Sequence, residues 1–190
     1  VASLPGGRGD GQPINTLIDL EPGTTITSYF AGPLSAQLLM SGSGGYGFIA
    51  KLESMCARNK AGKAFVTIQD GETLCAPSVI GGTNGSVDLP EATHVACVST
   101  SGNVLSYALS ELKLMSGGRG LQLMKIDEGD ALAGAAAYTR SVRITGVGRG
   151  GKVKEESLEI RSLNAALGKR ASKGKTTGWT FKPNGVYRVE

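Results

Sequence analysis

Apolar residues in this chain fall in short runs that alternate with polar or glycine-rich turns. The runs at residues 15–20 and 24–30 are separated by a Glu-Pro-Gly turn. In the run at 46–55, Tyr46 and Phe48 share one face, which is the period of two expected of a strand. The pattern therefore predicts short strands joined by tight turns.

The same order of runs recurs further along the chain. One or two helical turns are predicted at residues 158–167, with residues 131–137 as a second candidate. The other runs predict strands at residues 37–40, 64–68, 73–80, 94–100, 104–114, 121–126, 131–138, 141–147, 152–163, 179–181 and 186–189.

A basic, glycine-bearing loop stands between successive groups of runs. Gly9, Gly62, Gly120 and Gly174 mark four copies, separated by 53, 58 and 54 residues. A near-even period of that size, with four short strands in each, is typical of a propeller. We therefore predict an all-β fold of about four blades, four strands each, forming a single domain over residues 1–190.

Composition agrees with this fold class and argues against several others. The 29 glycines in 190 residues are about double the usual share, which suits tight turns better than helices. Three cysteines, one histidine and no C-x-x-C pair argue against a disulfide framework or a zinc site, and favour a reducing compartment. No signal peptide or membrane-spanning run is present, and no acid–base pair or metal-ligand spacing points to an enzyme.

Charge is distributed unevenly along the chain. Residues 1–139 carry 8 Lys and Arg against 12 Asp and Glu, a net charge of −4, whereas residues 140–190 carry 12 against 4, a net charge of +8. Such asymmetry favours a polyanionic partner that is contacted mainly through the C-terminal third. A solvated basic face is the alternative interpretation.

Two stretches carry a resemblance to a known family. Gly-Tyr-Gly-Phe at 45–48 leads to Ala-Arg-Asn-Lys-Ala-Gly-Lys-Ala at 57–64, and Ser-Gly-Asn at 101–103 leads to Ser-Gly-Gly-Arg-Gly at 116–120. This order resembles the C-terminal domains of bacterial type IIA topoisomerase A subunits, which include gyrase A, over essentially the whole chain. The resemblance implies a β-pinwheel, a propeller-like ring that need not close, in which neighbouring blades exchange strands and the rim binds and bends duplex DNA.

The loops depart from the gyrase pattern. Gyrase relatives carry a basic box close to Gln-Arg-Arg-Gly-Gly-Lys-Gly, and the nearest loop here, at residues 58–63, keeps three cations and one glycine. This departure favours the topoisomerase IV branch of the family. The family domain usually begins with one more blade, which we expect this chain to lack together with the N-terminal part of the parent protein.

The resemblance also implies a division of labour. This part would be a non-catalytic module that presents double-stranded DNA to the topoisomerase core and tunes the choice of supercoil or crossing in relaxation and decatenation. We expect no cofactor here, with ATP and Mg²⁺ acting elsewhere in the parent enzyme. The implied partners are the B subunit of topoisomerase IV and a second A subunit in a homodimer, in the cytoplasm at the nucleoid and with no membrane.

The chemistry of the loops suits phosphate binding. Glycine lets the backbone approach a phosphate closely, and regularly spaced cations neutralise successive phosphates; about eight acting cations give a salt slope of about −7. Asp10 offsets Arg8 in the first loop, whereas the fourth loop holds four cations within seven residues. The candidate DNA-binding residues are Arg8, Arg58, Lys60, Lys63, Arg119, Arg149, Lys152, Lys169, Arg170, Lys173 and Lys175.

Another function class stays open at this point. A propeller can bind proteins through its faces without contacting nucleic acid, and glycine-rich turns with one cation are common in β proteins. Gly174-Lys175-Thr176 resembles a phosphate-binding P-loop, but five residues rather than four separate Gly168 from Gly174. We therefore carry DNA binding as the main hypothesis and a protein-interaction propeller as the second.

Overall fold

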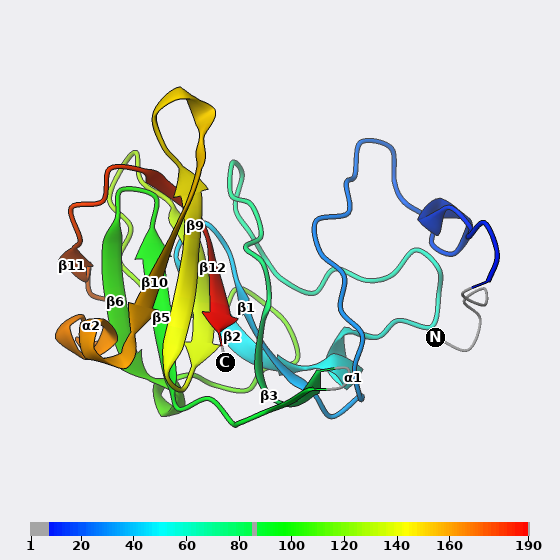
Figure 1. Cartoon of the computed structure of the whole chain (residues 1–190). Helices are drawn as coiled ribbons and strands as arrows, with labels where there is room; N and C mark the ends of the chain where they lie inside the picture. The colour runs from blue at the N-terminus through cyan, green and yellow to red at the C-terminus, as the bar shows by residue number, and fades with distance from the viewer. Residues whose placement is uncertain (1–7, 85–86, 190) are drawn as a thin grey trace.

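Three β-hairpins carry the fold in the computed structural model, which describes residues 8–84 and 87–189 (Figure 1). In each hairpin a glycine-containing turn joins two antiparallel strands, because glycine accepts the positive φ of the turn. The hairpins are β1 (Gln37–Ser41) with β2 (Tyr46–Lys51), β5 (His94–Ser99) with β6 (Asn103–Ala108), and β9 (Ser141–Val147) with β10 (Val153–Glu159).

A third strand pairs with the first strand of each hairpin. These strands are β3 (Ser78–Asn84) on β1, β8 (Leu132–Tyr138) on β5, and β12 (Lys182–Val189) on β9, all antiparallel. β4 (Val87–Leu89) then extends the first sheet by pairing with β3.

The second strand of a hairpin receives a strand from the following unit. β7 (Leu121–Gln122) pairs with β2, and β11 (Lys175–Thr176) pairs with β6. The resulting sheets have five, four and three strands, in the orders β4-β3-β1-β2-β7, β11-β6-β5-β8 and β10-β9-β12. The all-β prediction and the exchange of strands between neighbouring sheets are therefore confirmed.

A helical turn follows each hairpin. α1 (Leu52–Met55) follows β2, η2 (Leu109–Glu111) follows β6, and α2 (Ile160–Ala165) follows β10. The helical prediction for residues 158–167 is thus confirmed by α2. Two further 3₁₀ segments do not follow these helical turns: η1 (Ile14–Thr16) precedes the first hairpin, and η3 (Arg149–Gly151) lies between β9 and β10.

The second helical candidate, residues 131–137, is wrong because the stretch forms β8, which lies between two cores. Ala135 and Ala137 pack into one cluster, whereas Ala136 and Tyr138 pack into the other. A strand buried on both faces reads as a continuous apolar run, so its period of two is hidden in the sequence.

The first core, between the first and second sheets, also holds the most buried cysteine. Burial raises the pKa of the Cys97 thiol to about 12, although its Sγ lies 3.6 Å from the Tyr107 hydroxyl. All three cysteines are free, with Cys75 half-buried and Cys56 exposed. Cys97 is therefore a buried thiol of the core, whereas Cys56 lies at the surface.

The strands predicted at residues 15–20 and 24–30 are absent from the described part of the chain. Residues 17–36 form a coil that Figure 1 shows in blue, to one side of the sheets. Residues 64–68 make only an isolated bridge, from Val66 to Gly118. A run with β propensity becomes a strand only where it can pair with the edge of a sheet. Residues 24–30 have no such pairing, and the Tyr29 side chain in that run is 76% exposed.

Candidate nucleic-acid interface

The third basic loop (residues 116–120) and the fourth (residues 169–175) occupy equivalent places in successive units. Each follows a helical turn and leads into the exchanged strand that pairs with the previous hairpin. Gly120 (φ 85°) lies against the backbone of Gly47 in β2, and Gly174 (φ 77°) lies against that of Val104 in β6. The spacing of 54 residues between these two glycines thus corresponds to a structural repeat, whereas an added Cβ at Gly9 or Gly62 would meet nothing within 4 Å.

Matching backbone hydrogen bonds link these loops in series. The Thr67 N–H donates to the Gly118 carbonyl and the Gly118 N–H donates to the Phe65 carbonyl, at 3.0 and 2.9 Å. One unit later, the Lys125 N–H donates to the Ser172 carbonyl and the Ala171 N–H donates to the Leu123 carbonyl, at 3.0 and 3.1 Å.

These hydrogen bonds connect three basic loops in the order of the chain. The segment that follows the second loop (residues 58–63) contacts the third loop, and the segment that follows the third contacts the fourth. The loops therefore follow one another through backbone contacts, and the placing of Lys63, Arg119 and Lys173 on one shared edge stays a prediction.

The second loop presents its cations to solvent. Arg58, Lys60 and Lys63 are all exposed, and the Lys63 ammonium lies 5.7 Å from the centre of the Phe65 ring. The Asp19 N–H donates to the Lys60 carbonyl at 3.0 Å, which ties the loop to the N-terminal coil. The side chains are therefore available to an anion.

The third loop uses its cation differently. The Arg119 guanidinium donates to the Glu72 carboxylate at 2.8 Å and lies 4.3 Å from the centre of the Tyr46 ring. The two charged side chains are only 25% and 16% exposed. Arg119 therefore fixes the position of its loop in this structure.

The fourth loop combines inward and outward cations. Arg170 is half-buried and its Nη1 donates to the Gln122 carbonyl at 2.6 Å, whereas Lys169 is exposed. The Lys175 ammonium donates to the Ala165 carbonyl at 2.6 Å while remaining exposed, and Lys173 forms an ion pair with Asp127. The hydrogen bond and charge of Asp127 raise the pKa of Lys173.

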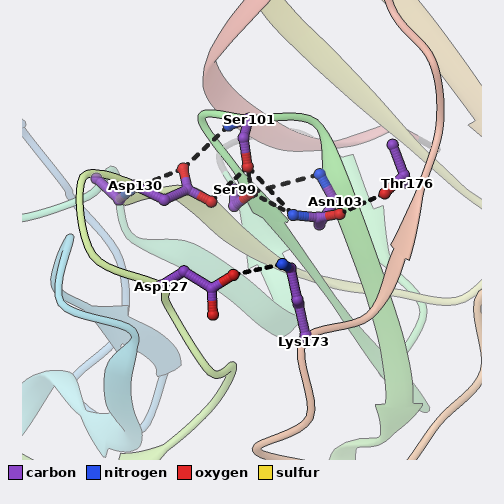
Figure 2. Close-up of polar contacts among 8 residues, drawn as sticks. Ser99, Ser101, Asn103, Asp127, Asp130, Lys173 and Thr176 are labelled. Atoms are coloured by element: carbon purple, nitrogen blue, oxygen red, sulfur yellow. Dashed lines mark hydrogen bonds and ion pairs between the residues drawn. The ribbon is translucent and has the colours of Figure 1, made fainter.

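Asp127 begins an acidic turn, residues 127–130, that a hydrogen-bond network holds in place (Figure 2). The Asp130 carboxylate accepts from the Thr100 hydroxyl at 2.7 Å and from the N–H groups of Ser101 and Ala131 at 3.0 and 2.8 Å. Partial burial alone raises the pKa of Asp130, but hydrogen bonds from Ser101, Thr100 and their neighbours outweigh it and lower this pKa to about 2.

Three predicted residues lie outside these three loops. Arg149 and Lys152 are at the turn between β9 and β10, a hairpin that extends beyond the other sheets in Figure 1. Arg8 is exposed at the start of the described chain, near the acidic Asp10. Contact with DNA stays a prediction for these residues, as it does for the loop cations.

Two further lysines flank the third loop and were not predicted. Lys113 and Lys125 are exposed on either side of it, and Lys125 also adjoins the fourth loop through its N–H. The sequence does contain a sign of this position for Lys125. It is the single charged residue in the apolar run 121–126, which implies that its side chain points outward.

The described residues offer little for covalent or metal chemistry. Among residues 8–84 and 87–189, no three His, Cys, Asp or Glu side chains are arranged to hold a metal ion. The Tyr138 hydroxyl is buried 2.6 Å from the Ser106 hydroxyl, and burial raises its pKa, so this tyrosine packs the core. None of the helices in the described part is both long and apolar enough to cross a membrane.

Comparison with known proteins shows what this chain is similar to. Residues 93–138, which span one unit from β5 to β8 with the third loop, match the family model for the DNA gyrase C-terminal domain, beta-propeller. The A subunit of DNA topoisomerase 4 from Neisseria gonorrhoeae is 35% identical over 170 residues, which are 89% of this chain and 22% of that protein. The Escherichia coli K12 protein of the same name is 28% identical over 177 residues, 90% of this chain and 22% of its own length.

Solved structures extend the likeness to the whole fold. The structure of the E. coli ParC C-terminal domain matches with a TM-score of 0.79 and 26% identity, covering 97% of this chain and 73% of that one. The DNA gyrase A C-terminal domain matches with a TM-score of 0.63 and 18% identity, covering 90% of this chain and 56% of that one. The chain spans about a fifth of the length of the curated relatives that it matches.

Proposed function

Because the chain belongs to the family of C-terminal domains of DNA gyrase A and of the A subunit of DNA topoisomerase 4, we propose that it binds and bends duplex DNA. The observation that carries this proposal is the series of basic loops at residues 58–63, 116–120 and 169–175, joined by repeated backbone hydrogen bonds. A duplex that follows successive loops would be held at several phosphates along a curved edge. Such contacts position the duplex without reading its bases.

The cations divide into two groups for this function. Arg119 and Arg170 point into the protein and hold their loops, so they contribute less to phosphate binding than spacing alone suggests. Asp127 holds Lys173 in an ion pair, so five cations act and the slope of log K against log[salt] should be about −4.5. With Lys173 included, six exposed loop cations are left. They are Arg58, Lys60, Lys63, Lys169, Lys173 and Lys175.

Fluorescence anisotropy with a linear duplex, measured from about 50 mM to about 200 mM salt, tests the proposal. We expect affinity to fall steeply with salt, little preference among sequences, and a shorter end-to-end distance of a doubly labelled duplex on binding. Affinity indifferent to salt, or no binding at the lowest salt, would contradict the proposal and favour a protein-interaction module.

In the longer protein, this part would present bent DNA to a topoisomerase core and tune which supercoils or crossings are processed in relaxation and decatenation. We propose that the parent is an A subunit that forms a homodimer and assembles with the B subunit of topoisomerase IV in the bacterial cytoplasm. ATP and Mg²⁺ would act in the other parts of that enzyme. Comparing decatenation by the parent enzyme with and without this part tests the proposal; equal rates and equal supercoil preference would contradict it.

A further inference from the structure

The acidic turn at residues 127–130 repeats a turn one unit earlier, at residues 69–72. In both turns the N–H of the fourth residue donates to the carbonyl of the first, at 3.1 Å and 2.9 Å. In both, the third residue is a glycine with positive φ, 78° for Gly129 and 81° for Gly71. The two turns are therefore structural equivalents.

Each turn extends a carboxylate to the next basic loop, and the cation that it reaches occupies the same place in both loops. Glu72 pairs with Arg119, which directly precedes Gly120. Asp127 pairs with Lys173, which directly precedes Gly174. The place of the cation therefore repeats, while the carboxylate is the fourth residue of the first turn and the first residue of the second.

The two pairs differ in their exposure to solvent. The Arg119–Glu72 pair is mostly buried and packed on Tyr46, so a phosphate cannot reach it without displacing the loop. The Lys173 and Asp127 side chains are 56% and 42% exposed. This second pair can therefore separate at little cost, since ion pairs between exposed side chains contribute little to stability.

The turn that carries Asp127 is anchored at its other end. Hydrogen bonds to Asp130 from the turn between β5 and β6 anchor the other end of the same four-residue turn (Figure 2). Lys173 is on a long flexible side chain that can turn toward another anion, whereas the carboxylate stays beside the loop.

We propose that Asp127 competes with DNA phosphate for Lys173 and thereby limits the affinity of the fourth basic loop for DNA. This inference rests on the proposed DNA binding. A phosphate that approaches Lys173 meets the negative charge of Asp127 at close range, so binding requires either exchange of the ion pair or repulsion between the two anions. Glu128 and Asp130 are on the same turn, but their carboxylates form no ion pair with a loop lysine among the described residues.

Asp127→Asn tests the inference, with Glu128→Gln as the matched control. Both variants remove one negative charge from the same turn, and only the first frees Lys173. We expect Asp127→Asn to bind duplex DNA about three- to tenfold more tightly at low salt, with a slope steeper by about 0.9, because one more phosphate contact forms. Glu128→Gln is expected to change affinity less than about twofold, through long-range charge alone.

A second comparison isolates the lysine. In a Lys173→Met background, Asp127→Asn should raise the affinity for DNA no more than Glu128→Gln does, because the cation for which Asp127 and phosphate compete is gone. If the original chain binds DNA but Asp127→Asn and Glu128→Gln behave alike, or if tightening persists without Lys173, the inference is overturned and the proposed function stands. If the original chain binds no DNA at any salt, the proposed function itself fails.

Discussion

Gly120 and Gly174, 54 residues apart in the chain, each lie against the backbone of the preceding hairpin at the point where a basic loop enters an exchanged strand. At both positions φ is positive and an added Cβ would overlap with a carbonyl group, of Gly47 in one case and of Val104 in the other. The two glycines therefore serve the repeat by allowing the loop to approach the neighbouring sheet.

Replacing Gly174 by Ala should lower stability, because the side chain adds both strain at positive φ and a clash with β6. We expect a loss of about 2–4 kcal/mol in the free energy of unfolding. Urea denaturation followed by the fluorescence of Trp179, the single tryptophan, measures it. Gly62→Ala is the control: φ is 72° there but nothing lies within 4 Å, so the expected loss is about 1 kcal/mol.

Replacing Arg119 by Lys should also destabilise the fold, although charge is kept. A lysine cannot match the planar contact of the guanidinium with both Tyr46 and Glu72, so we expect a loss of about 1 kcal/mol. Arg119→Ala should cost more, since it leaves Glu72 half-buried without a counter-ion. Thermal unfolding compares both with Lys113→Ala, an exposed site; an equal midpoint for all three would refute the bracing role of Arg119.

The acidic turn should make stability depend on pH in the acid range. The pKa of Asp130 in the folded state is about 2, below its ordinary value of 3.8, so its contribution is complete above about pH 4 and is lost as the pH falls toward 2. We expect a contribution of about 1 kcal/mol, after allowing for solvent screening of this partly exposed carboxylate.

Urea denaturation at a series of pH values measures this dependence. Asp130→Asn should be less stable at pH 7 and should flatten the change in stability between pH 4 and 2. Glu128→Gln, on the same turn, should keep the slope of the original chain. Identical pH profiles for Asp130→Asn and the original chain would show that another carboxylate is responsible.

Lys169 and Arg170 are neighbours in the sequence with different expected roles. Lys169 is exposed, so Lys169→Ala should weaken DNA binding about threefold or more at low salt and leave thermal stability unchanged. Arg170 donates to the Gln122 carbonyl from a half-buried position, so Arg170→Ala should lower the melting temperature by a few degrees. A loss of stability in Lys169→Ala together with a loss of DNA affinity alone in Arg170→Ala would contradict this division of roles.

The repeat itself could be predicted from the sequence because it depends on local features. The spacing of Gly62, Gly120 and Gly174 reports tight turns, and these recur once in each unit. The family resemblance, carried by short motifs at 45–48 and 116–120, then supplied the exchange of strands, which no local pattern contains.

Pairings between distant residues could not be predicted in this way. Glu72 and Arg119 are 47 residues apart, and nothing in the sequence says that this carboxylate, rather than a phosphate, accepts from the guanidinium. The coil at residues 17–36 was missed for a related reason: its apolar residues suggest strands, but within the described chain no sheet edge receives them.

The exchange of β7 and β11 between sheets has a mechanical consequence. The third and fourth basic loops each lie in a stretch of chain that crosses from one sheet to the next. A force applied to such a loop is therefore transmitted to the paired strands of both sheets. Force from a curved duplex would then be shared between neighbouring sheets, and one unit could not separate without withdrawing a strand from its neighbour.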